Sequence, residues 1–238
     1  MNIDYFYVTD DIKDTLTTYR GPMLLLVTLS LAAYGTVFYS LKKFSTMYAL
    51  ETENLEIQKE TGRLHEAALQ LEQYANYDTL TGLPNRRFFF ESLKKAVTES
   101  ERHARRFALL YIDLDGFKGI NDAYGHEVGD EVLITLGGRL VKGIRKTDFV
   151  ARLGGDEFAV ILYDIEEMTV AENLAKNIHE MLQEVIHTDS LQCTINASFG
   201  IALYPDTGND CETLLRNADS AMYEIKRKGK GKIGIFRY

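Results

Sequence analysis

The stretch "ARLGGDEFAV" occupies residues 151–160. Two glycines, Gly154 and Gly155, are followed by two acids, Asp156 and Glu157, and apolar, strand-like residues lie on both sides. Glycine reaches positive φ without a steric penalty, so the pattern predicts a β-hairpin that turns at the glycines. An ordinary surface turn is the alternative interpretation. The two adjacent carboxylates make this turn a candidate functional site. The motifs in the rest of the chain decide between a functional site and an ordinary turn.

Strand-like apolar runs and segments of helical spacing alternate around this hairpin. The expected strands are 106–114, 157–164, 191–204 and 233–237, and the expected helices are 85–103, 120–144, 168–187 and 211–228. Adjacent hairpins joined by crossover helices predict an α+β domain, with helices packed on a central sheet. We assign residues 78–238 to this domain, which is long enough to bury its own core.

The first 41 residues differ from the rest in composition. Residues 1–21 are polar and acidic, and residues 22–41 form the uncharged run "PMLLLVTLSLAAYGTVFYSL". This length spans a hydrocarbon core of about 30 Å, and the run lacks the polar face of a core helix. An acidic leader and a long apolar run argue against a signal peptide. We expect one transmembrane helix; Lys42 and Lys43 behind it place the following residues in the cytoplasm.

Residues 42–77 contain no proline and carry an apolar seam whose spacings alternate between three and four. The seam positions are Met47, Leu50, Asn54, Ile57, Thr61, Leu64, Ala68, Leu71 and Ala75. This is the a/d pattern of a coiled coil. A lone amphipathic helix lying on the globular domain is the alternative. Because the seam persists for four heptads and Asn54 suits a register-setting position, we favour a parallel homodimer.

Composition indicates which broad class of protein this chain belongs to. The chain of 238 residues is 45% hydrophobic and 26% charged, which is typical of a folded protein. Its net charge of −8 argues against general nucleic-acid binding. Cys193 and Cys211 lack metal-ligand spacing and indicate free thiols in a reducing compartment.

A second acidic stretch, "DLDGFKGINDAYGHEVGD", covers residues 113–130. It lacks the third acid, the sixth-position glycine and the twelfth-position Glu of an EF-hand; a solvated acidic loop is the other alternative. Asp113 ends an apolar strand, however, where a carboxylate needs a cation beside it. Together with Asp156 across the adjacent strand it would form an oxygen-only site, which favours Mg²⁺ or Mn²⁺. Gly154 and Gly155 would let a phosphate reach backbone N–H groups.

The stretch "AMYEIKRKGKGK" covers residues 221–232. Lys226 and Lys230 are four residues apart and therefore lie on one helix face, and Lys228 and Lys232 extend the cluster. A solvated basic helix end is the alternative. Beside a site with two carboxylates, this cluster suits a triphosphate.

Several motifs in this order resemble the GGDEF family, the diguanylate cyclases, over about residues 76–238. They are "DTLTGLPNRRFF" (78–89), the stretch at 113–130, "RLGGDEF" (152–158), "SFGIALYP" (198–205) and the lysine-rich end. The resemblance implies a palm-like fold with a mostly antiparallel central sheet flanked by helices. It also implies that two GTP are joined into cyclic di-GMP with release of two pyrophosphates, at an active site formed between two GGDEF domains.

The resemblance also implies roles for individual residues. Asp113, the Leu114 carbonyl and Asp156 match the metal ligands; Asp156 also activates the ribose 3′-OH, and Glu157 is the acid that the family requires next to it. The GTP-binding positions are Phe117, Lys118, Asn121, Asp130, Gly154, Gly155, Lys226 and Lys230, of which Asn121 and Asp130 read guanine. The family usually has Arg-Asn after the glycine of the last motif, where this chain has "GKG"; lysine keeps the charge but loses the bidentate fork.

The segment "RKTD" runs from Arg145 to Asp148, shortly before the GGDEF turn. An R-x-x-D pair at a loop edge is usually a surface ion pair. At this offset it resembles the family's inhibitory site, so we expect the product, cyclic di-GMP, to bind here and inhibit.

The sequence thus predicts a single-pass protein of the bacterial cytoplasmic membrane with its GGDEF domain in the cytoplasm, using Mg²⁺ and binding GTP and cyclic di-GMP. The alternative is a catalytically weak GGDEF domain that acts at the membrane as a GTP- or cyclic di-GMP-binding module; the presence of Asp113, Asp156 and Glu157 argues against it. Asp130 disfavours an adenine-containing product. A membrane adaptor whose function is the coiled coil is the third alternative.

Overall fold

The computed structural model describes residues 4–188, 191–229 and 231–236, with side chains from residue 12 onward. The chain divides into two compact units, Met1–Ala68 and Leu69–Tyr238, which are described separately.

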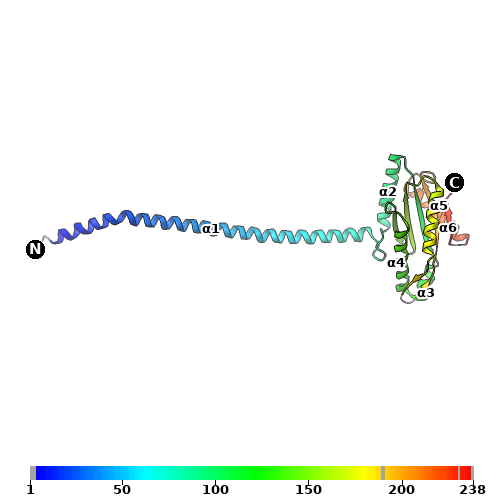
Figure 1. Cartoon of the computed structure of the whole chain (residues 1–238), viewed down its shortest axis with the longest axis horizontal. Coiled ribbons are helices and arrows are strands. Elements are labelled where there is room, and N and C mark those ends of the chain that lie inside the picture. Colours follow the sequence, from blue (N-terminus) through cyan, green and yellow to red (C-terminus); the bar gives the residue numbers. More distant parts are fainter. Residues whose placement is uncertain (1–3, 189–190, 230, 237–238) are drawn as a thin grey trace. The chain divides into compact units, whose positions relative to one another are not determined.

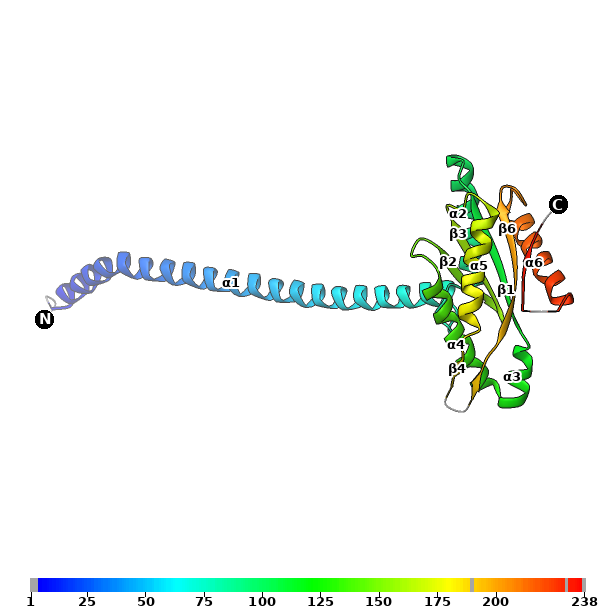
Figure 2. The ribbon, with the colours of Figure 1, turned by 45° about the vertical axis from the view of Figure 1, so that its right-hand side comes forward.

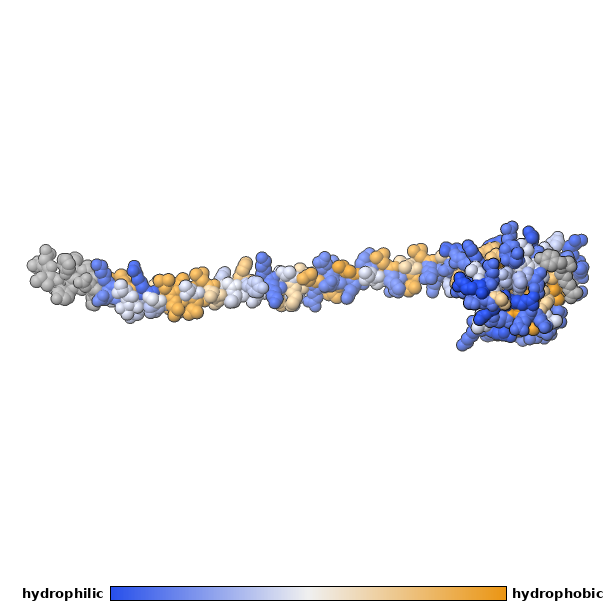
Figure 3. Space-filling model, turned by 90° about the horizontal axis from the view of Figure 1, so that it is seen from above, coloured by the Kyte–Doolittle hydropathy of each residue, from blue (hydrophilic) through white to orange (hydrophobic). Residues whose placement is uncertain are grey.

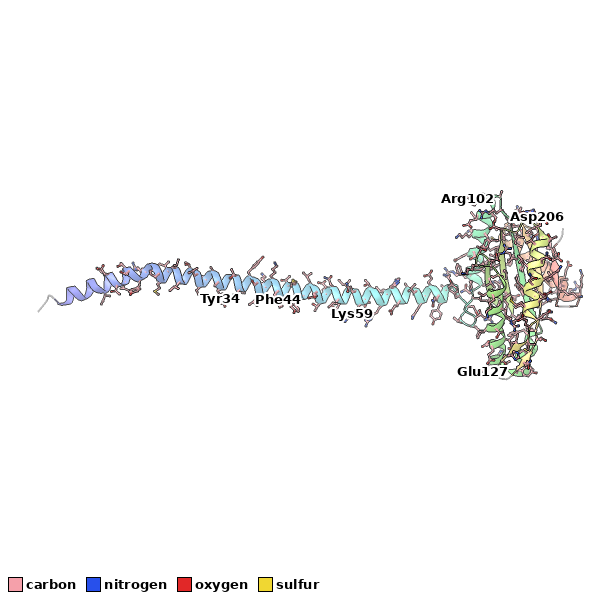
Figure 4. The ribbon with its side chains drawn as sticks, viewed as in Figure 1. Tyr34, Phe44, Lys59, Arg102, Glu127 and Asp206 are labelled. Carbon is pink, nitrogen blue, oxygen red and sulfur yellow. The ribbon has the colours of Figure 1, made fainter. Side chains whose placement is uncertain are left out.

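The first unit is part of one continuous helix, α1 (Asp4–Asn76), which Pro22 does not interrupt. Consecutive apolar side chains such as Leu24, Leu25 and Leu26 are all more than 60% exposed. Figure 3 shows orange, hydrophobic patches on the surface of this helix. By length and composition, α1 is the one helix in the described part of the chain that could cross a membrane. In Figure 4, labelled side chains such as Tyr34 and Lys59 point away from the helix axis.

The second unit confirms the predicted α+β architecture. Its elements are α2 (Arg86–His103), β1 (Phe107–Asp115), α3 (Phe117–Tyr124), α4 (His126–Gly143), β2 (Phe149–Gly154), β3 (Glu157–Tyr163), α5 (Met168–Leu182), β4 (Ile186–His187), β5 (Gln192–Cys193), β6 (Asn196–Tyr204), α6 (Cys211–Arg227) and β7 (Ile233–Ile235). The main sheet has the order β2-β3-β1-β6-β7, and β4 pairs with β5 separately. All pairs in the main sheet are antiparallel except β6–β7.

The sheet lies between two helical layers, because side chains alternate between the faces of its central strand. Even-numbered residues of β1, such as Leu110, pack with Leu136 of α4 and Ile178 of α5. Odd-numbered residues, such as Leu109, pack with Leu93 of α2 and Leu214 of α6. Figures 1 and 2 show α4 and α5 over one face and α6 at the other.

Three predicted element boundaries are wrong. The expected helix 120–144 is two helices, α3 and α4, because Gly125 has φ +88°, which no continuing α-helix adopts. The expected helix 168–187 ends at Leu182, and the β-branched residue Ile186 begins the short strand β4. The expected strand 191–204 is divided into the short β5 and the long β6.

Within the second unit, the loop 77–85 ties the end of α1 to α2. The side-chain amide of Asn85 donates to the Ala75 carbonyl at 2.8 Å, and its backbone N–H donates to the Asn76 carbonyl at 2.8 Å. The same side chain caps α2 by accepting from the Phe88 N–H at 3.0 Å. One asparagine therefore fixes both helix ends against each other.

Candidate active site

The end of β1 carries a nearly buried carboxylate. Asp113 is 8% exposed and forms an ion pair with Lys226 at the end of α6. Burial raises the pKa of Asp113; the hydrogen bond from Lys226 opposes this rise, and the nearby Asp156 and Glu157 carboxylates add to it. Among the described residues, the cationic group beside Asp113 is the ammonium group of Lys226.

The GGDEF residues form the β2–β3 turn, as the glycines predicted. Gly154 has φ +142° and Gly155 has φ +52°; both are exposed, with open space where a Cβ would stand. The Asp156 carbonyl accepts from the Leu114 N–H at 3.2 Å, and Glu157 is the cross-strand partner of Asp113. The turn therefore brings the acids of β3 next to those of β1.

Arg152 holds this turn in place, a role that the sequence interpretation missed. Its Nε and Nη2 donate to the Gly155 carbonyl at 3.1 and 2.8 Å, and its Nη1 donates to Asp78 Oδ1 at 2.9 Å. Burial raises the pKa of Asp78, but hydrogen bonds from Thr81 and Arg152 outweigh it, so the pKa lies below its ordinary value. Arg152 thus links the loop after α1 to the GGDEF turn.

Tyr111 is a second residue that the sequence interpretation did not select. It lies two positions before Asp113 on the same face of β1, with the Glu157 carboxylate of β3 near its hydroxyl. Burial and that carboxylate raise the pKa of Tyr111. The alternation of strand side chains was the available signal, but the contact depends on strand pairing.

The expected guanine-reading pair lies on α3 and α4. Gly129 permits their close approach, because a Cβ there would lie 1.9 Å from Asn121 Oδ1. Asp130 is the next residue of α4 and is exposed. Asn121 Oδ1 is buried without a hydrogen-bond partner among the described residues. Phe117 is buried at the start of α3, whereas Lys118 is exposed.

The C-terminal lysines lie in different surroundings. Lys226 contacts Asp113, and Lys228 Nζ lies 3.3 Å from Glu224. Lys230 lies outside the described residues. Of the two lysines predicted to contact the triphosphate, the structure brings Lys226 to the acids.

The R-x-x-D segment lies at the other end of the hairpin from the GGDEF turn. Asp148 Oδ1 accepts from the N–H of Tyr163, the last residue of β3, at 3.2 Å, and Oδ2 accepts from the Arg145 N–H at 3.0 Å. Arg145 and Asp148 line a cavity of about 350 Å³ together with Lys146. In Figure 4, the labelled residues Asp206 and Glu127 lie at opposite ends of the second unit; Glu127 is in α4, just after α3.

The donor set of this site fits a hard cation. Asp113 at the end of β1 and Asp156 in the β2–β3 turn supply carboxylate oxygens, with Glu157 beside them. Such donors suit Mg²⁺ or Mn²⁺. Within residues 4–188, 191–229 and 231–236, no group of three or more His, Cys, Asp or Glu side chains is arranged to hold a metal ion.

Comparisons with known proteins find similar sequences and similar folds. The family model "Diguanylate cyclase, GGDEF domain" matches residues 75–232. The bifunctional diguanylate cyclase/cyclic di-GMP phosphodiesterase MucR of Pseudomonas aeruginosa is 42% identical over 173 residues, covering 73% of this chain and 25% of MucR. The chain spans less than half the length of such curated relatives.

Two solved structures are similar in fold. The GGDEF domain of TpbB from Pseudomonas aeruginosa is 41% identical with a TM-score of 0.65, covering 68% of this chain and 94% of that domain. The coiled coil and GGDEF domain of DgcB from Caulobacter crescentus, in complex with c-di-GMP, is 29% identical with a TM-score of 0.71, covering 78% of this chain and 98% of that one.

Proposed function

This chain belongs to the GGDEF diguanylate cyclase family, and we propose that it joins two GTP molecules into cyclic di-GMP with release of two pyrophosphates. The observation that carries the proposal is the meeting of three segments at one end of the sheet: Asp113 of β1, the Gly154–Glu157 turn and Lys226 of α6. Carboxylates, a glycine turn that a phosphate can approach and a lysine are together the groups that phosphoryl transfer requires.

The proposed reaction assigns a role to each of these groups, and Asp156 has two. Asp113 and Asp156, with the Leu114 carbonyl, hold a divalent cation, which supplies charge neutralisation on the phosphate oxygens. Asp156 accepts the proton of the ribose 3′-OH that attacks the α-phosphate of the second GTP, and pyrophosphate leaves. Glu157 stays beside it, near the hydroxyl of Tyr111.

Substrate binding uses the groups around this centre. The open turn at Gly154 and Gly155, and the start of α3 at Phe117 and Lys118, receive phosphate oxygens. Lys226 pairs with Asp113 in the nucleotide-free chain and would turn to the triphosphate when GTP binds; Lys230 is expected to join it. The Asp130 carboxylate can accept from N1–H and the exocyclic amine of guanine, and Asn121 assists it.

Each domain would bind one GTP, so a complete active site needs two domains. We propose that residues 42–77 pair as a parallel coiled coil, and that residues 22–41 anchor the chain in the bacterial cytoplasmic membrane after the short extracytoplasmic segment 1–21. The exposed apolar side chains of α1 support a partner for this helix. Product binding at Arg145 and Asp148, beside their cavity, would inhibit the enzyme.

The test is to purify the full chain in detergent micelles, add GTP and Mg²⁺, and identify the nucleotides by mass spectrometry. Cyclic di-GMP in the reaction, increasing with time, is the expected product. Unchanged GTP from a folded, dimeric sample free of bound cyclic di-GMP would contradict the cyclase and favour the binding module. If cyclic di-GMP copurifies, a hydrolase that removes it is added first, so that feedback inhibition does not hide activity.

A further inference from the structure

The second acid of the "DLD" motif, Asp115, has no role in the proposed reaction. It is the last residue of β1 and continues the row of odd-numbered side chains that faces α2 and α6. Asp113 stands in the same row two residues earlier and meets Lys226 of α6. Both acids of the motif are thus directed to the end of α6 and the loop that follows it.

Asp115 binds this loop through its backbone. Oδ2 accepts from the Gly231 N–H at 2.7 Å. The hydroxyl of Ser198, a fully buried residue of β6, lies 3.0 Å from each carboxylate oxygen. Ser198 therefore sets the orientation of the carboxylate, and the carboxylate in turn holds the loop between α6 and β7.

The place where Gly231 is held is closely fitted. Gly231 has φ +60°, and a Cβ there would lie 3.3 Å from Asn196, the cross-strand partner of Asp115. Asn196 is itself held by the side-chain amide of Gln183, which donates to its Oδ1 at 2.7 Å. On the other side of Gly231, the Lys232 carbonyl accepts from the Phe199 N–H at 3.0 Å. The loop is therefore fixed at Gly231 and Lys232.

We propose that Asp115 is a positioning residue. It fixes the loop after α6, at Gly231 and Lys232, for binding of the GTP triphosphate. The proposal rests on the proposed function. The other contact of this end of α6, between Lys226 and Asp113, joins two groups that the reaction itself uses. Asp115 takes no part in the proposed reaction, so its hydrogen bond to Gly231 persists when Lys226 turns to the triphosphate.

The rival role for Asp115 is that of a further cation ligand, and an isosteric variant separates the two. In Asp115→Asn the amide oxygen still accepts from Gly231 and the amide nitrogen can donate to the Ser198 hydroxyl, whereas the negative charge is gone. In Asp115→Ala both bonds are lost. A positioning role therefore tolerates asparagine, and a ligand role does not.

The first experiment measures kcat and KM for GTP, and the Mg²⁺ dependence, on the full chain in detergent micelles. We expect Asp115→Ala to raise KM by about tenfold with kcat within about threefold, since a hydrogen bond to a charged acceptor is lost. Asp115→Asn should stay within about twofold of the wild type in both constants. Asp122→Ala, an exposed acid of α3 in the same motif, is the matched control and should change neither.

The second experiment does not depend on activity. Limited trypsin digestion of the nucleotide-free chain, read by mass spectrometry, compares cleavage after Lys228 and Lys232. We expect severalfold faster cleavage in Asp115→Ala and wild-type rates in Asp115→Asn and Asp122→Ala. Faster cleavage confined to this loop supports local release rather than unfolding.

Two results would overturn the proposal. Unchanged KM and unchanged cleavage in Asp115→Ala would show that the loop does not depend on this residue. An equal loss in Asp115→Asn and Asp115→Ala, with a raised Mg²⁺ requirement, would make it a cation ligand; Asp115→Asn alone decides this if the alanine variant fails to fold. If the wild type makes no cyclic di-GMP, the proposed function fails, and the cleavage comparison still decides whether Asp115 holds the loop.

Discussion

The two units of this chain present their apolar side chains in opposite ways. In the first unit the helix exposes them: Leu31 is 67% exposed and Leu64 is 61% exposed. In the second unit, leucines such as Leu110 are completely buried in one of two cores on the faces of the sheet. The second unit therefore has cores of its own, whereas the first unit buries none of these apolar side chains within itself.

Two parts of the helix also differ in how their apolar side chains are arranged. Between residues 22 and 41 the apolar side chains surround it, which suits lipid on all sides. Between residues 47 and 75 they form a seam, which suits a second helix. We infer that chemistry and stability belong to the second unit, and that the helix contributes location and pairing. The predictions below test this division, from the largest expected effect to the smallest.

A single substitution in the second unit should remove nearly all cyclic di-GMP formation. Asp156→Asn removes a proposed cation ligand and proton acceptor without changing size. We expect cyclic di-GMP formation to fall by about 10³-fold, the order seen when a group that stabilises transition-state charge is lost. Quantitative mass spectrometry of the product checks this, and Asp122→Asn is the control. Retained activity in Asp156→Asn would move the active site elsewhere.

The stability of the two units should respond differently to the same substitution. Leu110→Ala opens a cavity in the core and should lower the free energy of unfolding of the second unit by about 3 kcal/mol. Leu31→Ala on the exposed helix should leave it unchanged. Urea titration in detergent, followed by near-ultraviolet circular dichroism, gives both values. Similar losses in the two variants would mean that the units are not independent.

Breaking the helix should affect pairing but not substrate binding. Leu64→Pro costs about 3 kcal/mol in a helix interior and interrupts the seam. We expect cyclic di-GMP formation to fall by about 100-fold while the Kd for a non-hydrolysable GTP analogue stays within about twofold. Gly62→Ala, which favours the helix, should retain full activity. Wild-type turnover in Leu64→Pro would refute the role of the seam.

Product inhibition should depend on Arg145. Its removal should raise the cyclic di-GMP concentration that halves turnover by about tenfold, because an arginine bound to phosphate or guanine contributes charge-assisted hydrogen bonds. The readout is the initial rate with added product. Lys142→Ala, an exposed lysine of α4, should inhibit like the wild type. Unaltered late-time slowing in Arg145→Ala would exclude this inhibitory site.

The smallest effect concerns acid stability at Asp78. The folded-state pKa of Asp78 is lowered by Thr81 and Arg152, so the ionised carboxylate stabilises the second unit above about pH 4 and this contribution disappears as the pH falls through the folded-state pKa. Asp78→Asn should lower the free energy of unfolding by about 1 kcal/mol at pH 7, with less difference from the wild type below pH 4.

The control is Asp164→Asn, which breaks an exposed pair with Arg105 and should change stability little at any pH. Equal curves for Asp78→Asn and the wild type between pH 3 and pH 7 would contradict the stabilising role of the Asp78–Arg152 pair.

Much of the fold followed from local patterns. The apolar run of β1 was located to within one residue at each end, and the hairpin turn at Gly154 and Gly155 follows from glycine chemistry. The break at Gly125 was missed because helical spacing continues across it, and only its positive φ ends the helix. Local periodicity therefore predicts the type of element better than its boundaries.

The proximity of Asp113 to the turn at Asp156 could be predicted, because both motifs lie at the ends of expected strands. The roles of Arg152 and Asp115 could not be predicted, because each joins segments far apart in the sequence: Arg152 bonds to Asp78, and Asp115 bonds to Gly231. Their partners are a loop carboxylate and a backbone amide, neither of which leaves a pattern in the sequence.

The central claim is that the second unit carries the chemistry and the helix pairs two copies. The measurement that tests it most directly is the specific rate of cyclic di-GMP formation as a function of protein concentration. It compares residues 69–238 alone with the full chain in detergent micelles. If the domain carries the chemistry and the helix pairs it, the specific rate of residues 69–238 rises with concentration, whereas that of the full chain is constant and higher. A constant, equal specific rate for both proteins would contradict the account, since one domain without its helix would then suffice.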